Sequence, residues 1–581
     1  MAVKYLKKSN RDDFYLPGEE IKINARTSFT HFSSDKDPLG VCKNRLLFAV
    51  LAFIAVYAVL AIRVFDLCVI PNLGEDTPAT ELRAYAANPI RRADILDRNG
   101  TIIATSLPTV NLYANPRKIL NPREASRQLV KILPDLKAEE VYKKLTARGS
   151  FVYLKRNLTP SQQYQINYLG IPGLEFENGE KRVYPHKNLF AHIIGATNID
   201  NEGISGIEKE LDERLTQSDI PLTLSVDVGV QDTIRENLLA AVDKFHALGA
   251  TAVLLDVKTS EIIAMVSLPD FDPNINKVKN ENALFNMATK GVYEPGSVLK
   301  IFNTAMSLES GKVKVADRFD ATEPLKLKYN VIKDYRGENR WLSVPEILVY
   351  SSNIGSARMA LKVGGNEQRN FLEKIGFFEE LSVEVAERGK PLVPKRWGEG
   401  TIATVAFGYG LAVSPLHVVT GYAAMVNGGI YHSPTLIKNG PKTKDGHRVI
   451  SFNTSKQMRG LMRLVVTDGS GKRANVPGYE VAGKTGTANK LNEKGKYVDK
   501  KVRTTFVSAF PISNPKYALI VMLDEPKALK ETWGFVTSGW NTVPTAAKII
   551  EAIAPQLNIK ANYDLDELRK NRIIEASFGK R

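Results

Sequence analysis

A serine and a lysine three residues apart could form a nucleophile and the base that activates it. Ser297 and Lys300 follow Pro295 and Gly296, which break regular structure, and they precede an apolar run with helical spacing. Residues three apart share a helix face, so a deprotonated Lys300 amine can take the proton of the Ser297 hydroxyl. The N-terminus of a helix also favours negative charge near Ser297. The spacing predicts a nucleophile at the start of a helix that ends at Gly311.

The Ser-x-x-Lys pattern alone is a weak signal, because it also begins at Ser33, Ser513 and Ser577. None of these three matches follows Pro-Gly or opens an apolar helix. Chance is the ordinary explanation of a single match, so the remainder of the chain has to distinguish Ser297.

A hydroxyl and a carboxamide follow a predicted helix start. Ser343-Val344-Pro345-Glu346 is a capping box, and the helix that it opens leads into Ser351-Ser352-Asn353. The side chains of Ser351 and Asn353 could face the same site as Ser297. The alternative is an ordinary polar cluster at a helix end, since Ser-x-Asn recurs at Ser451-Phe452-Asn453.

One Lys-Thr-Gly sequence occurs in the chain, within Val481–Ala488. Small residues around Lys484 are typical of an edge strand along which an extended ligand can lie. Gly486 would allow close approach, because it has no side chain.

The elements around these motifs predict one antiparallel sheet. Leu222–Asp227 alternates as a strand, and Asp227 can cap the following helix. Two hairpin-like strand pairs, one near each end of the region, consist of residues 251–257 with 262–267 and residues 504–510 with 517–523. Helices lie between them, so the N- and C-terminal segments of this domain are expected to close the sheet together.

A separate block precedes this domain. Arg91–Ala104 reads as a hairpin with an Asn99-Gly100 turn, and residues 123–148 read as short helices. His186 and His192 have no Cys or carboxylate cluster beside them, so we expect structural roles and no metal site.

Composition bounds the class of protein. The chain has 581 residues and a formal net charge of +16, enough length for two or more domains. Lys and Arg are scattered among acids, which disfavours a nucleic-acid-binding arm. The net positive charge is equally compatible with attraction to a membrane surface or to an acidic polymer.

Leu46–Ile62 is the strongly apolar segment of the chain. Its 17 uncharged residues would form a helix of about 26 Å, and the apolar Val64 and Phe65 extend it past an Arg63 that can snorkel. We expect an uncleaved membrane helix with a cytoplasmic N-terminus, because cations precede it and carboxylates follow it (Lys36, Lys43, Arg45, Glu75 and Asp76). A cleaved signal peptide fits less well, since the first Ala-x-Ala site, Ala84–Ala86, lies too far beyond. Cys42 and Cys68 flank the segment, and no disulfide joins them if it spans a bilayer.

In their order, the three motifs resemble those of penicillin-recognising serine acyl-enzymes. The resemblance extends over about residues 88–555 and is greatest to class B penicillin-binding proteins of the division-specific FtsI type. Further segments that carry it are residues 92–100, 182–185, 203–208, 227–231, 407–410 and 414–416. Ala93 and Ser260 stand where the family usually has Gly, and residues 379–400 match poorly.

The resemblance implies an α/β (α+β) penicillin-recognising transpeptidase fold, an antiparallel sheet flanked by helices, with an elongated pedestal and one transmembrane helix. The expected parts are a cytoplasmic tail (1–43), a transmembrane helix (44–66), a non-catalytic pedestal (67–218), a transpeptidase domain (219–558) and a C-terminal tail (559–581). The catalytic domain would be periplasmic, at the division septum.

The resemblance also implies the roles of single residues. Ser297 would attack the D-Ala-D-Ala bond of a peptidoglycan stem peptide, with Lys300 as base and Ser351 as proton relay. Which group takes the first proton stays open. A cationic Lys484 would be catalytic as well, since it would help to lower the pKa of Lys300. Asn353 would hold the substrate amide, and Thr485, Gly486 and Thr487 with Lys484 would hold its carboxylate end. The backbone amides of Ser297 and Thr487 would form the oxyanion hole.

No cofactor is implied. The implied partners are lipid-linked stem peptides, β-lactams as covalent inhibitors, the membrane, a polytopic glycan polymerase of the FtsW type and other division proteins.

Alternatives remain open at this point. An elongation-specific transpeptidase or a D,D-carboxypeptidase would use the same chemistry, and a non-enzymatic division scaffold would not use it at all. A β-lactamase or β-lactam sensor fits less well, because the Glu-x-x-Leu-Asn signature of class A enzymes is absent from the sequence.

Overall fold

The computed structural model describes residues 47, 49–61, 91–275, 278–328, 330–440, 445–492 and 495–563. The chain divides into two compact units, Met1–Asn88 and Pro89–Arg581. In the first unit residues 49–61 are helical. No helix among the described residues has both the length and the apolarity that a membrane span needs. The expected membrane helix 44–66 lies partly outside the described residues, and the expected tail 1–43 lies wholly outside them.

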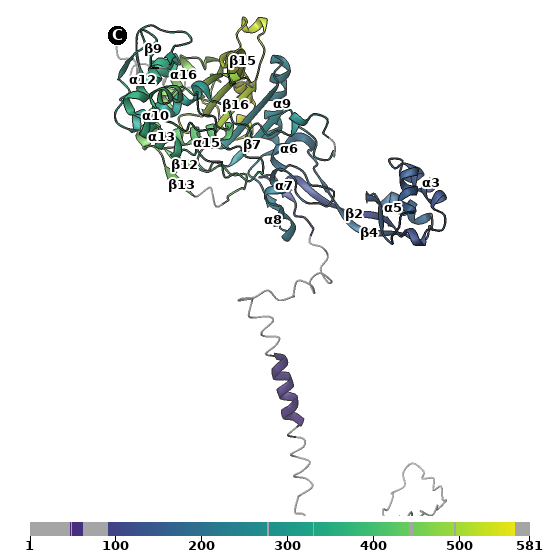
Figure 1. Cartoon of the computed structure of the whole chain (residues 1–581). Helices are drawn as coiled ribbons and strands as arrows, with labels where there is room; N and C mark the ends of the chain where they lie inside the picture. Colours follow the sequence, from purple (N-terminus) through teal and green to yellow (C-terminus); the bar gives the residue numbers. More distant parts are fainter. Residues whose placement is uncertain are drawn as a thin grey trace, which may run out of the picture. The chain divides into compact units, whose positions relative to one another are not determined.

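The second unit contains the predicted antiparallel sheet (Figure 1). Its strand order is β14-β15-β16-β6-β7, so strands from both ends of the region pair at its centre. The strands are β6 (Gly249–Asp256), β7 (Ile262–Leu268), β14 (Ala482–Leu491), β15 (Tyr497–Phe510) and β16 (Tyr517–Asp524). This confirms the sheet and both predicted strand pairs, and it places β14 at an edge.

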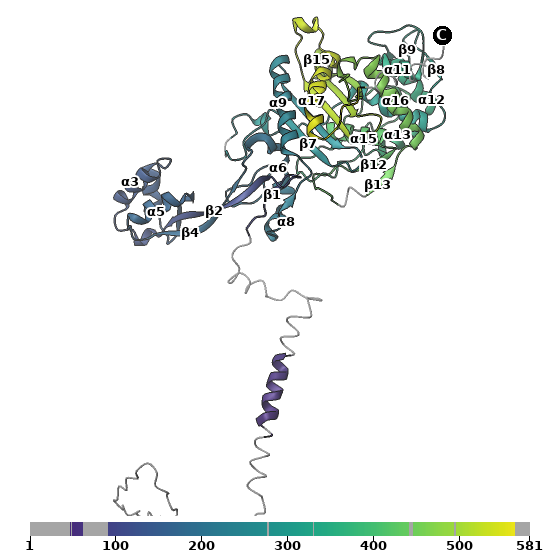
Figure 2. The ribbon, with the colours of Figure 1, turned by 180° about the vertical axis from the view of Figure 1, so that it is seen from behind.

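Helices cover both faces of this sheet because its strands bury apolar side chains on both faces. On one face, α9 (Val228–Phe245) and α17 (Thr542–Gln556) pack against each other and against the strands (Figure 2). Asp227 caps α9 as predicted, since its side chain accepts from the backbone N–H of Val230. On the other face lie α10 (Lys300–Glu309), α15 (Pro415–Val426) and α16 (Phe452–Thr467).

Further helices and short strands of this region pack on α10, α15 and α16 and on one another. The helices are α11 (Val344–Val349), α12 (Asn353–Val363), α13 (Gly365–Lys374) and α14 (Glu399–Val405). The short strands are β8 (Arg318–Asp320), β9 (Leu325–Lys326), β10 (Val331–Ile332), β11 (Trp341–Ser343), β12 (Ile430–His432) and β13 (Gly446–Arg448).

A second five-stranded sheet precedes this one in the sequence. Its strands are β1 (Ile95–Leu96), β2 (Ile102–Ala114), β3 (Val152–Leu158), β4 (Leu174–Val183) and β5 (Leu222–Thr223). The β1–β2 hairpin turns at Asn99-Gly100, as predicted. The strand expected over Leu222–Asp227 is shorter and lies parallel to β1, not in the sheet that contains β6 and β7. The pairing of this strand with β1 does not continue to Asp227, because the backbone amide of Ser225 donates to the carbonyl of Leu436.

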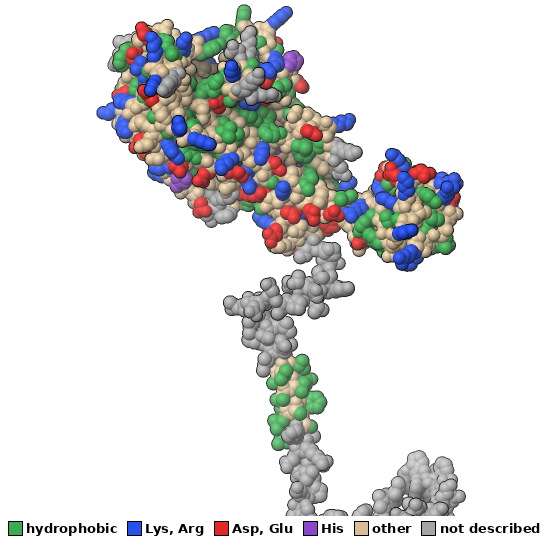
Figure 3. Space-filling model, viewed as in Figure 1, with side chains coloured by type: hydrophobic (Ala, Val, Ile, Leu, Met, Phe, Trp, Pro, Cys, Tyr) green, Lys and Arg blue, Asp and Glu red, His purple; other side chains and the backbone are tan. Residues whose placement is uncertain are grey.

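The far ends of β2 and β4 lead into a distal lobe with its own core. The lobe contains β3, α3 (Pro122–Ile132), α4 (Ala138–Leu145) and α5 (Pro160–Tyr168), which confirms the short helices predicted over 123–148. Its core is built on Leu112, Leu129, Leu145, Leu158 and Ile166. Figure 3 shows Lys and Arg side chains on the visible face of this lobe.

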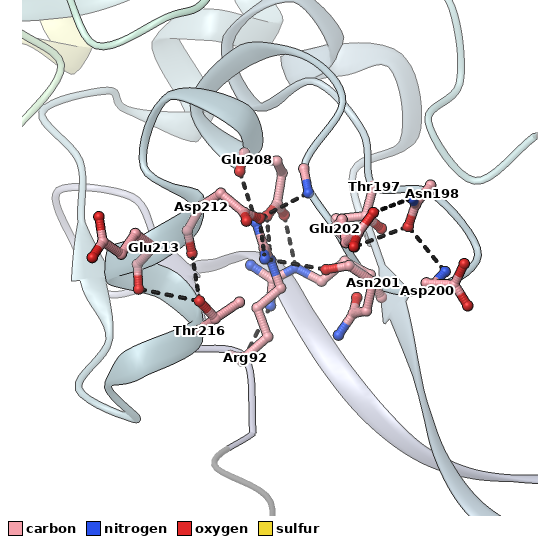
Figure 4. A network of polar contacts seen from close by, with 12 residues as sticks. Arg92, Thr197, Asn198, Asp200, Asn201, Glu202, Glu208, Asp212, Glu213 and Thr216 are labelled. Atoms are coloured by element: carbon pink, nitrogen blue, oxygen red, sulfur yellow. Dashed lines mark hydrogen bonds and ion pairs between the residues drawn. The ribbon is translucent and has the colours of Figure 1, made fainter. Parts of the chain in front are cut away.

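The near part of the pedestal is organised around a buried ion cluster (Figure 4). The Glu208 carboxylate lies 2.7 Å from the guanidinium groups of both Arg92 and Arg182. Arg92 also pairs with Asp212 at 2.7 Å and donates to the carbonyl of Asn201. Burial of these charges is tolerated because each has a partner. Three of the segments that carry the family resemblance therefore meet at one point.

Short helices complete this part of the pedestal. They are α6 (Ala191–Ile194), α7 (Gly206–Glu210) and α8 (Asp212–Gln217).

One hydrophobic core crosses the expected boundary at residue 219. Ile95, Ile193 and Ile207 of the pedestal belong to the same buried cluster as Val253 and Phe302 of the catalytic region. Residues 379–400, which match the family poorly, add polar contacts between the two parts. Glu387 accepts from the amide of Gly206, and Arg388 pairs with Glu210 at 2.7 Å.

Candidate active site

Ser297 lies at the entrance to α10, as the sequence predicts, but in a tighter turn. Gly296–Leu299 is a 3-10 turn, and the α-helix begins only at Lys300. The helix ends at Glu309, and Gly311 follows in the left-handed conformation with φ +68°. Ser297 is half-buried, whereas Lys300 is fully buried.

The Lys300 amine is surrounded by oxygens of the first two motifs. Its Nζ lies 2.7 Å from Ser297 Oγ and 2.7 Å from Asn353 Oδ1. The carbonyl oxygen of Ser351 lies 2.8 Å from the same nitrogen, and the Ser351 hydroxyl lies at 3.2 Å. The structure therefore brings Ser297, Lys300, Ser351 and Asn353 together around one nitrogen.

Burial lowers the pKa of Lys300 well below its ordinary value, and repulsion from Lys484 adds to this, while Asp334 acts in the opposite direction. A neutral amine has two N–H donors and one lone pair. Asn353 Oδ1 and the Ser351 carbonyl can only accept, so they take the two N–H groups. The lone pair then faces the Ser297 hydroxyl, which is the arrangement that a general base needs.

Ser351 connects two helices in a strained conformation. It lies in the turn between α11 and α12 with φ +59°, a region that non-glycine residues rarely adopt. The capping box predicted at Ser343 and Glu346 is present and starts α11. The alternative match at Ser451 only caps α16, by accepting from the amide of Thr454.

Lys484 reaches the site from the edge strand β14. Its Nζ lies 2.9 Å from Ser351 Oγ and 3.1 Å from the carbonyl oxygen of Thr485. Burial lowers the pKa of Lys484 to about 7. The Ser351 hydroxyl therefore lies between two amines that are both readily deprotonated.

Gly486 permits a close approach within the protein itself. A Cβ at this position would lie 2.8 Å from the carbonyl oxygen of Pro295 and 2.8 Å from Val298 Cγ2. The close approach that Gly486 permits is thus between β14 and the Ser297 turn. Gly296 permits the same approach from the Ser297 turn, since a Cβ at Gly296 would lie 3.0 Å from the carbonyl oxygen of Thr487 in β14.

The two threonines of the third motif have protein partners. Thr485 Oγ1 lies 2.6 Å from Ser470 Oγ, and Thr487 Oγ1 accepts from the amide of Ser538 at 3.2 Å. Thr485 is buried, whereas Thr487 is half-buried.

Of three further residues near the site, Asp334 and Ser470 had no signal in the sequence, whereas Glu294 belongs to the Tyr-Glu-Pro-Gly stretch before Ser297. Asp334 accepts hydrogen bonds from the Ser-x-Asn motif. Glu294 accepts from the Gly410 amide at 2.7 Å and from the Tyr497 hydroxyl at 3.1 Å. Ser470 contacts Thr485. Their partners are distant in the sequence, so no local spacing marks these contacts.

His186 and His192 lie apart from these motifs. His192 is buried with Nε2 2.8 Å from the carbonyl oxygen of Ala283, and burial lowers its pKa. His186 packs edge-on against Phe190. Both contacts are those of structural side chains.

A serine hydroxyl facing a buried lysine, on a sheet flanked by helices, defines the class of serine enzymes that form an acyl-enzyme. Residues 250–548 match the model of the penicillin binding protein transpeptidase domain, and residues 87–220 match that of the penicillin-binding protein dimerisation domain. The chain belongs to the penicillin-binding protein transpeptidase family.

Similar proteins cover most of the chain. A probable peptidoglycan D,D-transpeptidase FtsI of Caulobacter vibrioides is 35% identical and covers 82% of each chain. Peptidoglycan D,D-transpeptidase FtsI of Escherichia coli K12 is 29% identical over 81% of this chain and 84% of its own. Probable peptidoglycan D,D-transpeptidase PenA of Neisseria gonorrhoeae is 30% identical over 83% and 88%.

Solved structures share the fold. A peptidoglycan synthetase of Bifidobacterium adolescentis superposes with a TM-score of 0.65 at 22% identity, over 82% of this chain and 96% of that one. Penicillin binding protein 3 of Mycobacterium tuberculosis, complexed with aztreonam, gives 0.64 at 24% identity, over 82% and 98%.

Proposed function

We propose that this chain is a serine D,D-transpeptidase that cross-links peptidoglycan stem peptides in septal wall synthesis. The observation that carries the proposal is the 2.7 Å approach of Lys300 Nζ to Ser297 Oγ, with Lys300 buried. Relatives that cover most of the chain are named peptidoglycan D,D-transpeptidase FtsI, which supports the activity and is consistent with the proposed septal role.

In the first step Ser297 Oγ attacks the carbonyl between the two terminal D-alanines of a stem peptide. Lys300 takes the hydroxyl proton as the C–O bond forms, and the oxyanion accepts from the backbone amides of Ser297 and Thr487. The C–N bond then breaks and releases D-alanine. The product is an ester between Ser297 and the shortened stem.

The leaving amine needs a proton, and Ser351 is placed to deliver it. Its hydroxyl lies 3.2 Å from Lys300 Nζ and 2.9 Å from Lys484 Nζ. Ser351 gives its proton to the amine and regains one from Lys300. In the second step an amine of a neighbouring stem attacks the ester, which regenerates Ser297 and closes the cross-link. The same groups open a β-lactam ring, which leaves a slowly hydrolysed acyl-enzyme.

Substrate recognition is assigned to the strand edge and to the Ser-x-Asn turn. The donor stem lies along β14, where Thr485, Gly486 and Thr487 with Lys484 hold its carboxylate end. Asn353 holds the substrate amide through the second N–H of its carboxamide, since the first donates to the Lys333 carbonyl at 2.9 Å.

Intact mass spectrometry tests the proposed chemistry. The full chain is incubated with benzylpenicillin, and adducts are followed over hours. We expect a persistent adduct that Ser297→Ala abolishes and that Ser513→Ala, in another Ser-x-x-Lys match, leaves unchanged. Rapid turnover of the adduct would indicate a β-lactamase instead, and a wild-type chain without any adduct would indicate a scaffold.

A second assay separates cross-linking from hydrolysis. The chain is given a donor ending in D-Ala-D-Ala together with a D-amino acid amine as acceptor. We expect aminolysis to exceed hydrolysis. Hydrolysis alone would make the chain a D,D-carboxypeptidase.

The proposed organisation follows the expected parts of the sequence. Residues 44–66 anchor the chain in the inner membrane, with residues 1–43 in the cytoplasm and the pedestal and catalytic domain in the periplasm. The pedestal and the anchor contact a polytopic glycan polymerase of the FtsW type. The distal lobe has its own core, so it can be replaced by a short link between β2 and β4. Polymerase activity in reconstituted membranes should then fall, and unchanged activity would contradict the contact.

A further inference from the structure

The Ser-x-Asn turn is held by a carboxylate from a distant loop. Asp334, which follows β10, accepts from the Ser352 hydroxyl at 2.7 Å and from the backbone amides of Asn353 and Ile354 at 2.5 and 3.0 Å. These amides begin α12, so the carboxylate also lies at the positive end of that helix. One side chain thus fixes three consecutive residues.

The residue before Asp334 fixes the side chain of the same motif. The carbonyl oxygen of Lys333 accepts from the amide nitrogen of Asn353 at 2.9 Å. The opposite end of that carboxamide, Oδ1, lies 2.7 Å from Lys300 Nζ. Since one end of the amide is tied to Lys333, the oxygen faces Lys300.

Ser351 itself needs such support. Its left-handed φ of +59° is unfavourable for a residue with a Cβ and persists only where the surroundings fix it. Lys300 contacts its carbonyl oxygen from one side, and Asp334 anchors the next residues from the other.

We propose that Asp334 is a positioning residue for acylation. Its carboxylate holds the Ser351–Asn353 turn so that the Ser351 hydroxyl and the Asn353 oxygen stay on Lys300. The proposal rests on the proposed function, because it assigns Asp334 to the reaction of Ser297.

Asp334 also adds a charge to the surroundings of Lys300. The charged groups that act on the Lys300 amine are Lys484 from β14, which lowers its pKa, and Asp334, which raises it. Neutralising Asp334 should therefore lower the pKa of Lys300 further. The neutral base would then persist to lower pH, so the acidic limb of the pH–rate profile should move to lower pH.

The experiment measures acylation by benzylpenicillin between about pH 5 and 10 in the full chain. Wild type and Ser297→Ala establish the reaction itself, so a failure of the proposed function shows before Asp334 is tested. For Asp334→Asn we expect the acylation rate to fall roughly 100-fold, because small misplacements of reacting groups cost about that much. We also expect the acidic limb to move to lower pH while Tm changes little.

Asp334→Glu keeps the charge but displaces the carboxylate. It should reduce the rate with the acidic limb near its wild-type position, and it serves as the test if Asp334→Asn does not fold. Asp320→Asn is the matched control, since Asp320 is half-buried, lies in β8, and contacts Thr322 and Arg358. It should leave both rate and profile unchanged. Wild-type acylation rates in both Asp334 variants would overturn the proposal. It would also be overturned if Asp334→Asn were slower but had a lower Tm and an acidic limb at the wild-type position.

Discussion

The side-chain nitrogen of Lys484 lies 2.9 Å from the hydroxyl oxygen of Ser351, although 133 positions separate them in the sequence. The same oxygen lies 3.2 Å from Lys300 Nζ. One hydroxyl therefore joins an amine of the edge strand to an amine of the helix that carries the nucleophile.

Replacing Ser351 with Ala should break this connection. We expect acylation by benzylpenicillin to slow by about 100-fold or more, the usual contribution of a positioned proton-transfer group. Stopped-flow mixing or timed mass spectrometry measures the rate. An unchanged rate would show that protons reach the leaving group by another route.

Ser451→Ala is the control for that substitution. Ser451 belongs to the second Ser-x-Asn match but only caps α16. Loss of the cap should cost about 1 kcal/mol of folding free energy and leave the acylation rate unchanged.

The buried Lys484 makes stability depend on pH. Its pKa is lowered to about 7 in the folded protein, whereas an unfolded chain keeps an ordinary lysine. Between about pH 7 and 10 the unfolded state therefore binds more protons, so folding stability rises with pH. The stability gained from a neutral Lys484 decreases as the pH falls towards 7. Below about pH 7 both states bind the proton, so Lys484 no longer makes stability depend on pH.

Urea unfolding at several pH values measures this effect. Lys484 should contribute a slope of up to roughly 1.4 kcal/mol per pH unit, the value for one such proton. Lys484→Met should remove this contribution and leave that of the buried Lys300, whose pKa is also lowered. Equal slopes in the two proteins would mean that Lys484 stays protonated in the folded state.

The contact between β14 and the Ser297 turn should be sensitive to one methyl group. Gly486→Ala places a Cβ 2.8 Å from the Pro295 carbonyl oxygen and from Val298. We expect a loss of about 1–3 kcal/mol from this overpacking, and slower acylation because the turn must move.

Gly460→Ala provides the comparison, because it lies in α16 and a Cβ there meets nothing within 4 Å. This change should stabilise the protein by about 0.5–1 kcal/mol, since Ala is the better helix former. Equal effects of the two substitutions would argue against the steric explanation.

Removing the charge of Glu208 should destabilise the pedestal and the catalytic region together. Glu208→Gln leaves Arg92 and Arg182 buried with a weakened partner, a type of change that costs about 3–5 kcal/mol. Because the core is continuous from Ile95 to Phe302, thermal unfolding should move as one transition.

The Tm measured by calorimetry and the temperature at which penicillin binding is lost should fall by the same amount. Glu213→Gln, on the exposed face of α8, should change neither. Separate transitions for penicillin binding and pedestal unfolding would contradict the continuous core.

Local patterns predicted the parts of this fold whose signals are local. The Asn99-Gly100 turn, the Asp227 cap and the Ser343 capping box are each set by a few neighbouring residues, and each is present. The ordered triple predicted that its three motifs share one site. In the structure Lys300 contacts both Ser297 and Ser351, and Lys484 contacts Ser351.

Other features depend on long-range packing, which alternation alone does not specify. The pattern at Leu222 gives a strand but not its partner, so its place beside β1 was missed. Asp334 belongs to a polar loop, and its role depends on Asn353 folding back onto it. The close packing of Gly486 on Pro295 likewise joins segments far apart in the sequence, so no local pattern indicates it.

The continuous core also determines where related chains could exchange parts through recombination. A crossover at residue 219 would join two halves of one apolar interface that had never been fitted to each other. Along β2 and β4, paired strands connect the shared core to the separate core of the distal lobe, and an ion pair between Arg156 and Asp200 adds a surface contact. Chimeras joined within these two strands should fold with a new lobe, so the lobe is the portion of the pedestal that can diversify by exchange.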